Sequence, residues 1–253
     1  MEYRRNREYN DVMKSSEGGI NMRKSYLDNI RWLTVVIVVF YHVIYMYNAQ
    51  GVQGGLGKIT NMEVQYQDIF LYAVFPWLMP ILFIVSGICS RLYLDKHTDK
   101  EFIRSRTNKL LVPSTLGGLV FFFIQGYINM SLSSTGAEQL EGVPVIVRYI
   151  IMVFVGTGVM WYIRLLWLFS ILLLWIRKVE KDRLWNKAKQ SNLVVLVLLY
   201  IPLWLSAQIL NMPVIVVYRF GFYFVLFLIG YFVFSHDDVI DILKQKALIL
   251  SLI

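Results

Sequence analysis

Long apolar runs alternate with short polar segments along the whole chain. Six runs approach the ~20 residues that a helix needs to cross a bilayer: 30–48, 69–90, 110–130, 161–177, 192–210 and 216–234. Unpaired backbone groups are costly in hydrocarbon, so each run predicts a membrane-spanning helix. A seventh run extends from Ala247 to Ile253, and the shorter segment from Val143 to Val155 carries Arg148 and is predicted to be interfacial or re-entrant. We therefore expect an all-α, polytopic membrane helix bundle with six full spans plus the start of a seventh.

The same pattern predicts one membrane domain preceded by a polar tail. Residues 1–29 lack an apolar core, and the first apolar run lacks a small-residue cleavage signature, so no cleaved signal is expected. Residues 1–29 should form a cytoplasmic N-terminal tail. Residues 30–253 should form the membrane domain, incomplete at its C-terminal end because the seventh run is too short to cross.

The composition agrees with a lipid environment. Hydrophobic residues make up 57% of the chain and charged residues only 17%, whereas about a quarter of the residues of a soluble domain are charged. The net charge of +8 would suit nucleic acid, but the basic residues lie between apolar runs rather than on a soluble face. We expect no nucleic-acid partner. Cys89 is the only cysteine, which excludes an internal disulfide.

The distribution of Lys and Arg predicts the orientation in the membrane. Most of the 25 basic residues lie in the tail, in the loops 91–109 and 177–191, and after the sixth run. The intervening loops hold only Lys58 and Arg148. Because cytoplasmic loops retain Lys and Arg, we expect a multi-pass protein of the cell membrane with its N-terminus in the cytoplasm.

Two polar residues in the first run do not suit lipid. A charge at the centre of a spanning helix costs about 2.5 to 3.5 kcal/mol, and even a neutral imidazole there needs a polar partner. Arg31 lies at the cytoplasmic end and can extend to the interface, whereas His42 lies just beyond the middle of the run. Eleven residues leave them ~20° apart around a helix and ~16 Å apart along it. They predict one polar stripe; alternatively, His42 is a satisfied packing residue.

Small and basic residues between the second and third runs have two interpretations. Ser86 and Gly87 allow close helix packing and a bond across the interface. Arg104, Arg106 and Lys109 can be a retention signal for cytoplasmic loops, which accounts for them by itself, or a phosphate site, since these cations suit phosphate oxygens. Other patterns fail: Gly51 to Lys58 lacks the glycine and hydroxyl positions of a phosphate loop, and the three histidines lack metal-ligand spacing.

Four segments together resemble the acyltransferase 3 family of integral-membrane O-acyltransferases. An Arg and a His separated by ten residues in the first span are its hallmark. The matching segments keep the family's order over residues 25–177: Tyr26 to Arg31 with His42, Phe83 to Gly87, Arg104 to Pro113, and Trp161 with Tyr162. The chain departs from the family pattern at Ile88, where an aromatic is usual, and at Lys109, where a second Arg is usual.

This resemblance implies the following activity and site. The donor would be cytoplasmic acyl-CoA, usually acetyl-CoA, with no permanently bound cofactor or metal; the acceptor would be a hydroxyl of a glycan or small molecule outside the cytoplasm. His42 would act as general base or carry the acyl group, with Arg31 beside it in the catalytic site. The CoA phosphates would bind Arg104, Arg106 and Lys109. The residues expected to line the site are Asp28, Ser86, Gly87, Trp161 and Arg164.

A multispan transporter or exporter is the main alternative, because intramembrane Arg and His also mark substrate and proton pathways. The combination of the Arg/His spacing with the Ser-Gly and basic motifs favours the enzyme. A non-catalytic membrane scaffold would tolerate substitution at both Arg31 and His42. Dependence of acylation on acyl-CoA separates the enzyme from the other two classes.

Overall fold

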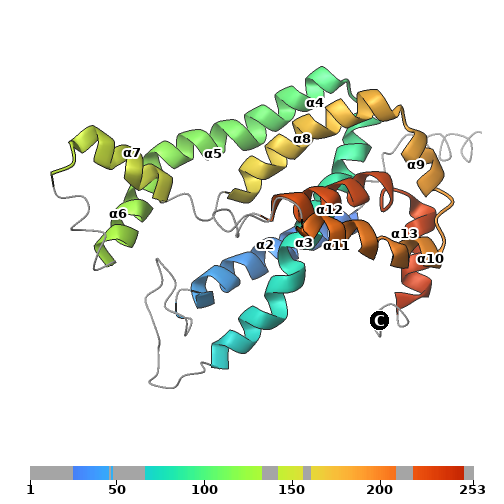
Figure 1. Cartoon of the computed structure of the whole chain (residues 1–253), viewed down its shortest axis with the longest axis horizontal. Helices are drawn as coiled ribbons and strands as arrows, with labels where there is room; N and C mark the ends of the chain where they lie inside the picture. The colour runs from blue at the N-terminus through green and yellow to red at the C-terminus, as the bar shows by residue number, and fades with distance from the viewer. Residues whose placement is uncertain are drawn as a thin grey trace, which may run out of the picture.

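The computed structural model describes residues 25–45, 47, 66–132, 142–155, 161–208 and 219–247, and within them the chain is helical, with no strand (Figure 1). The first half holds α2 (Ser25–Tyr45), α3 (Tyr66–Leu94), α4 (Asp99–Arg106), η1 (Thr107–Leu111), α5 (Val112–Gly117), η2 (Gly118–Phe122) and α6 (Phe123–Leu132). The second half holds α7 (Val145–Val155), α8 (Trp161–Glu180), α9 (Arg183–Ala188), α10 (Leu193–Leu198), α11 (Tyr200–Gln208), α12 (Phe220–Phe232) and α13 (Asp237–Gln245). The all-α prediction is confirmed.

Two of these helices, α2 and α3, are long and apolar enough to cross a membrane. A third candidate is the pair α12 and α13 if it counts as one span, although its two helices are bent by 106°. The predicted run 110–130 is divided between η1, α5, η2 and α6, and the run 192–210 between α10 and α11. Six full spans therefore remain a prediction. The tail up to residue 24 and the end of the seventh run, residues 248–253, lie outside the described residues.

The packing centre is the crossing of α3 and α12, and paired glycines make it close. A Cβ on Gly87 would lie 2.8 Å from the backbone nitrogen of Tyr231 and nearer still to the carbonyl oxygen of Phe227. A Cβ on Gly230 would in turn meet the backbone of Ile84. Helices that lack side chains at the crossing can bring their backbones together, as small residues do in membrane helix pairs. Gly87 therefore has the packing role that the sequence predicted for it.

The helical segment from α4 through α5 runs antiparallel to α8 (Figure 1). Arg177 near the end of α8 pairs with Asp99 at the start of α4, with 2.9 Å between Nη1 and Oδ1. Trp167 in the middle of α8 donates from Nε1 to the hydroxyl of Thr107 in η1 at 3.1 Å. The guanidinium of Arg164 lies over the ring of Phe122 in η2, 5.4 Å from its centroid. Both η1 and η2 are π-helical, so each inserts an extra residue into the helical register.

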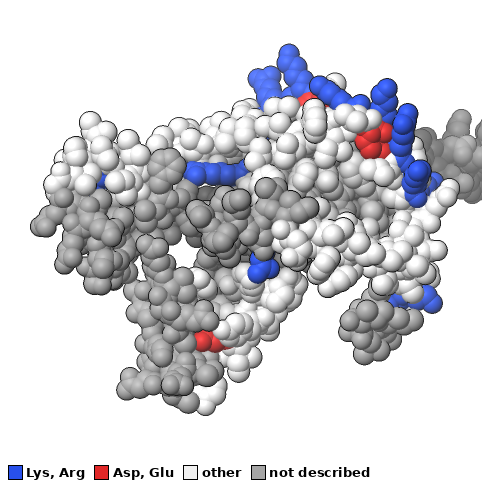
Figure 2. All heavy atoms as spheres, viewed as in Figure 1, with Lys and Arg blue, Asp and Glu red and all other residues white. Residues whose placement is uncertain are grey.

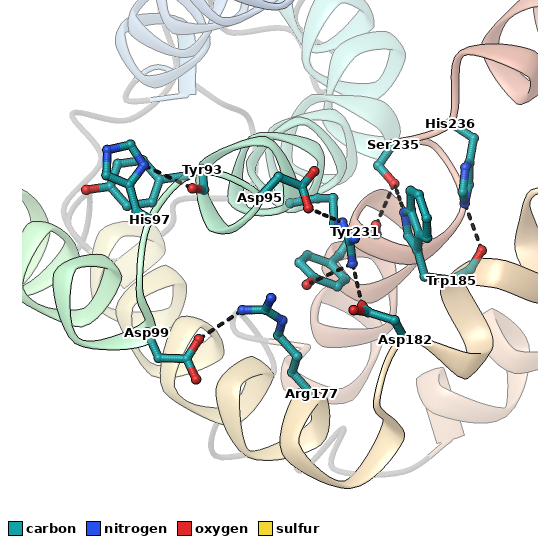
Figure 3. Close-up of polar contacts among 11 residues, drawn as sticks. Tyr93, Asp95, His97, Asp99, Arg177, Asp182, Trp185, Tyr231, Ser235 and His236 are labelled. Carbon is teal, nitrogen blue, oxygen red and sulfur yellow. Dashed lines mark hydrogen bonds and ion pairs between the residues drawn. The ribbon is translucent and has the colours of Figure 1, made fainter.

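Arg91, near the C-terminal end of α3, is almost fully buried and contacts segments that follow later in the chain. Its guanidinium pairs with Asp95 at 2.9 Å and with Asp182 at 2.5 Å, and both aspartates are labelled in Figure 3. It also lies 4.1 Å from the ring centroid of Trp185 and 3.5 Å from the hydroxyl of Tyr231. One cation thus joins α3 to the turn between α8 and α9, to α9 and to α12.

Exposed basic residues gather along one edge of the molecule, over α4, the end of α8, and α9 (Figure 2). This edge is the one the sequence assigns to the cytoplasm. Its exposed members are Lys100, Arg104, Lys178, Lys181, Arg183, Lys187 and Lys189.

Candidate active site

The candidate site begins with a polar pair on the face of α3 that meets α8. The hydroxyls of Ser86 and Tyr162 lie 2.8 Å apart, and the Tyr162 hydroxyl also lies 3.3 Å from the carbonyl oxygen of Leu82, to which it donates. Ser86 is buried. Hydrogen bonds therefore hold the first turn of α8 against the last third of α3. Two of the four segments that resemble the family, Phe83 to Gly87 and Trp161 with Tyr162, are thus in contact.

Arg106 reaches the same face of α3 from the end of α4. Its Nη2 donates to the hydroxyl of Ser90 at 2.9 Å, and Ser90 is fully buried. The guanidinium also lies 5.1 Å from the ring centroid of Phe102. Burial lowers the pKa of Arg106, and the nearby charge of Arg31 lowers it further. In the described part of the chain Arg106 forms no ion pair with a carboxylate, so its charge is available to an anion.

Arg31 approaches this group from α2. It lies close enough to Cys89, one residue before Ser90 on α3, for its charge to act on the thiol, and the same charge acts on both Arg106 and Tyr162. Arg31 and Arg106 therefore come from different helices to one place beside α3. Two like charges in a half-buried setting repel each other, and a bound anion would relieve the repulsion. We call Arg31, Cys89, Ser90 and Arg106 the arginine site.

The three cations expected to bind phosphate do not share this position. Arg106 turns inward, whereas Arg104 and Lys109 are exposed. Arg104 is two residues from Arg106, which places it on the opposite face of an α-helix. Lys109 lies within the π-helical turn η1, and the extra residue of that turn rotates it away from Arg106.

His42 lies at the other end of α2 from Arg31. Its Nδ1 lies 2.7 Å from the carbonyl oxygen of Val38, and because a carbonyl can only accept, Nδ1 carries the hydrogen. The neutral ring therefore presents Nε2 as a proton acceptor. The neighbouring Tyr41 ring stacks on Phe75 of α3, with 6.1 Å between centroids. The structure places His42 on the same helix as Arg31 but outside the arginine site.

The remaining predicted lining residues have different surroundings. Asp28, three residues before Arg31, acts electrostatically on Cys89. Trp161 is buried beside Phe83, with 6.3 Å between ring centroids. Arg164, described above, faces η2 rather than the arginine site.

Ser90 and Cys89 were missed by the sequence interpretation. A signal for Ser90 was present, because Ser86 and Ser90 are four residues apart and so share one face of a helix. Cys89 carried no such signal, since a single cysteine in an apolar run is also typical of plain packing.

The comparisons with curated proteins and with solved structures each return no match. The family model described as an acyltransferase domain, Acyl_transf_3, matches residues 24–253. This match covers nearly the whole chain, including every residue of the arginine site and His42. The chain belongs to the acyltransferase 3 family and is a membrane acyltransferase.

Proposed function

We propose that this acyltransferase takes its acyl group, in the simplest case acetyl, from cytoplasmic acyl-CoA and transfers it to a hydroxyl of a glycan or small molecule on the other side of the membrane. The observation that carries the proposal is the meeting of Arg31 and Arg106 beside α3. A family of acyltransferases requires an acyl donor, and acyl-CoA is the common donor that also carries phosphates.

The chemistry of the arginine site suits those phosphates. Guanidinium groups present planar pairs of N–H donors that match phosphate oxygens, and hydrogen bonds between charged partners are roughly twice as strong as neutral ones. Cys89 and Ser90 add small polar groups at the same position without filling it with a large side chain. Arg104 and Lys109 are exposed in the same stretch of chain as Arg106 and would attract an anionic donor over a longer distance.

His42 supplies the acid–base step in this proposal. Its Nε2 takes the proton from the acceptor hydroxyl as the hydroxyl oxygen bonds to the thioester carbonyl carbon. The carbon–sulfur bond then breaks, CoA leaves as a thiolate, and the imidazolium returns the proton to it. The hydrogen bond from Nδ1 to Val38 supports this role, because it fixes the tautomer whose Nε2 is basic.

The distance between the two groups fits one extended donor. Arg31 and His42 lie on the continuous helix α2, and eleven residues correspond to ~16 Å along its axis. In acyl-CoA the extended pantetheine arm likewise separates the phosphates at one end from the thioester at the other. Phosphates at the arginine site would therefore leave the thioester free to reach toward His42, deeper in the membrane.

The test is acyl transfer by the purified chain in lipid nanodiscs with isotope-labelled acetyl-CoA and a mixture of hydroxyl acceptors, read by mass spectrometry. The expected result is donor-dependent label on an acceptor. The single thiol locates the donor: bound CoA should slow maleimide labelling of Cys89. Absence of both acyl-CoA binding and label transfer would overturn the proposal.

A further inference from the structure

The hydroxyl of Ser90 occupies a position that the family comparison does not explain. Ser90 is fully buried on α3, and its Oγ donates to the carbonyl oxygen of Ser86 one turn earlier at 2.7 Å. That bond uses its one proton. The lone pairs of Oγ therefore remain to accept a hydrogen bond, and they receive one from Arg106 Nη2 at 2.9 Å.

This arrangement fixes a long side chain from another helix. Arginine carries about 2 kcal/mol of rotamer entropy, which is lost when the side chain is held in one geometry. The hydrogen bond to Ser90 and the contact with the Phe102 ring restrain the Arg106 guanidinium before any ligand arrives. A guanidinium has five N–H donors, and among the described residues its one hydrogen bond goes to Ser90, so the other donors stay free for an anion.

The same face of α3 continues to Tyr162. Ser90 bonds the Ser86 carbonyl, and the Ser86 hydroxyl bonds Tyr162. One turn of α3 thus fixes both Arg106 from α4 and the start of α8. Each serine contacts a different helix: Ser86 contacts α8, and Ser90 contacts α4.

We infer that Ser90 is a positioning residue for the acyl donor: its hydroxyl orients Arg106 toward the donor's phosphates and so sets donor affinity. The inference rests on the proposed function, because it takes acyl-CoA as the ligand of the arginine site. Ser90 touches no reacting atom and acts only through Arg106.

The chain offers a matched control at Ser170. This serine is also buried, on α8, and donates to the carbonyl of Leu166 four residues earlier at 2.7 Å. In the described part of the chain its hydroxyl has no arginine partner. Ser90→Ala and Ser170→Ala therefore remove the same internal helix bond, and only the first removes an acceptor from a guanidinium.

Acyl-CoA affinity and transfer kinetics in nanodiscs test the inference. Ser90→Ala should raise both the donor Kd and the donor KM, by roughly two- to tenfold for a lost hydrogen bond, while kcat stays near the wild-type value. Ser170→Ala should leave both constants unchanged. In an Arg106→Ala background, Ser90→Ala should have no further effect on donor affinity, since the group it orients is gone.

The outcomes separate the two proposals. If wild-type protein binds no acyl-CoA, the proposed function fails. If wild-type protein binds acyl-CoA but Ser90→Ala matches Ser170→Ala, the positioning role alone is wrong. Ser90→Thr keeps the hydroxyl and should retain wild-type affinity. If the alanine variant does not fold, Ser90→Cys replaces it, because a thiol of similar size is a weak acceptor and should weaken donor binding in the same direction.

Discussion

Alanine at Gly87 tests the close packing of α3 against α12. A Cβ at this position would lie 2.8 Å from the Tyr231 nitrogen, whereas ordinary contacts begin at 3.4 Å. The difference, 3.4 minus 2.8, requires α12 to retreat by at least 0.6 Å, and by more from the carbonyl oxygen of Phe227. Neither backbone atom can rotate away as a side chain could. The two helices must therefore separate along the length of their contact.

The expected cost follows from that displacement. Overpacking a close-packed interior costs about 1 to 3 kcal/mol, and backbone contacts place Gly87→Ala at the upper end of this range. For a chain of this size about 3 kcal/mol corresponds to a fall in Tm of roughly 6 to 12 °C. Thermal unfolding in nanodiscs, followed by circular dichroism, measures it.

Gly117→Ala is the control for this substitution. A Cβ there would lie 4.0 Å from its nearest neighbour, the Phe121 ring, so it meets no resistance. Replacing a helical glycine with alanine contributes up to about 1 kcal/mol through helix propensity, and Tm should stay level or rise. A Gly87→Ala protein that melts together with wild type would refute the close crossing of α3 and α12.

Three further predictions concern orientation and chemistry. Reporter fusions should be outside the cytoplasm after Lys58 and Gln139, and inside after Lys100 and Lys187; an inside signal after Gln139 would overturn the predicted topology. Arg106→Ala should weaken acyl-CoA binding roughly tenfold to a hundredfold, as loss of a charged hydrogen bond does, and unchanged affinity in calorimetry would make this arginine a topology signal only. His42→Gln should keep donor binding but lower kcat by about 10² to 10⁴. More than about a tenth of wild-type kcat in that variant would contradict the role of a general base.

The sequence predicted where the chain is helical better than it predicted how each apolar run is split into separate helices. Apolar runs located the two long helices, because burial in lipid requires length and hydrophobicity alone. They did not reveal that the segment from α4 to α6 contains π-helical turns, because hydrophobicity does not distinguish an α-helical turn from a π-helical one. The 20-residue helix α8 also begins beside Ser86, in the last third of α3. Two spans of full length lying side by side would instead have their ends at the same level.

The sequence identified several candidate residues of the site, but it did not show which way their side chains face. Arg31 and Arg106 were named as candidate site residues because they are charged, and charge is visible in a sequence. Whether they come together depends on the orientation of each helix about its axis. This orientation leaves Arg104 and Lys109 exposed, whereas Arg106 is half-buried. Ser90 was missed for the opposite reason: a serine is common in close-packed spans, and its importance appears only when its partner is known.

The buried cation at the end of α3 has a consequence for how the chain is made. Arg91 emerges from the ribosome 91 residues before its partner Asp182 and 140 residues before Tyr231. At synthesis rates of about 5 to 20 residues per second, roughly 5 to 18 seconds pass before Asp182 exists. During that interval Asp95, four residues away, is the one partner already present among those that Arg91 finally pairs with. The C-terminal end of α3 therefore completes its burial only after the second half of the chain has been translated, which makes this contact a late step of assembly.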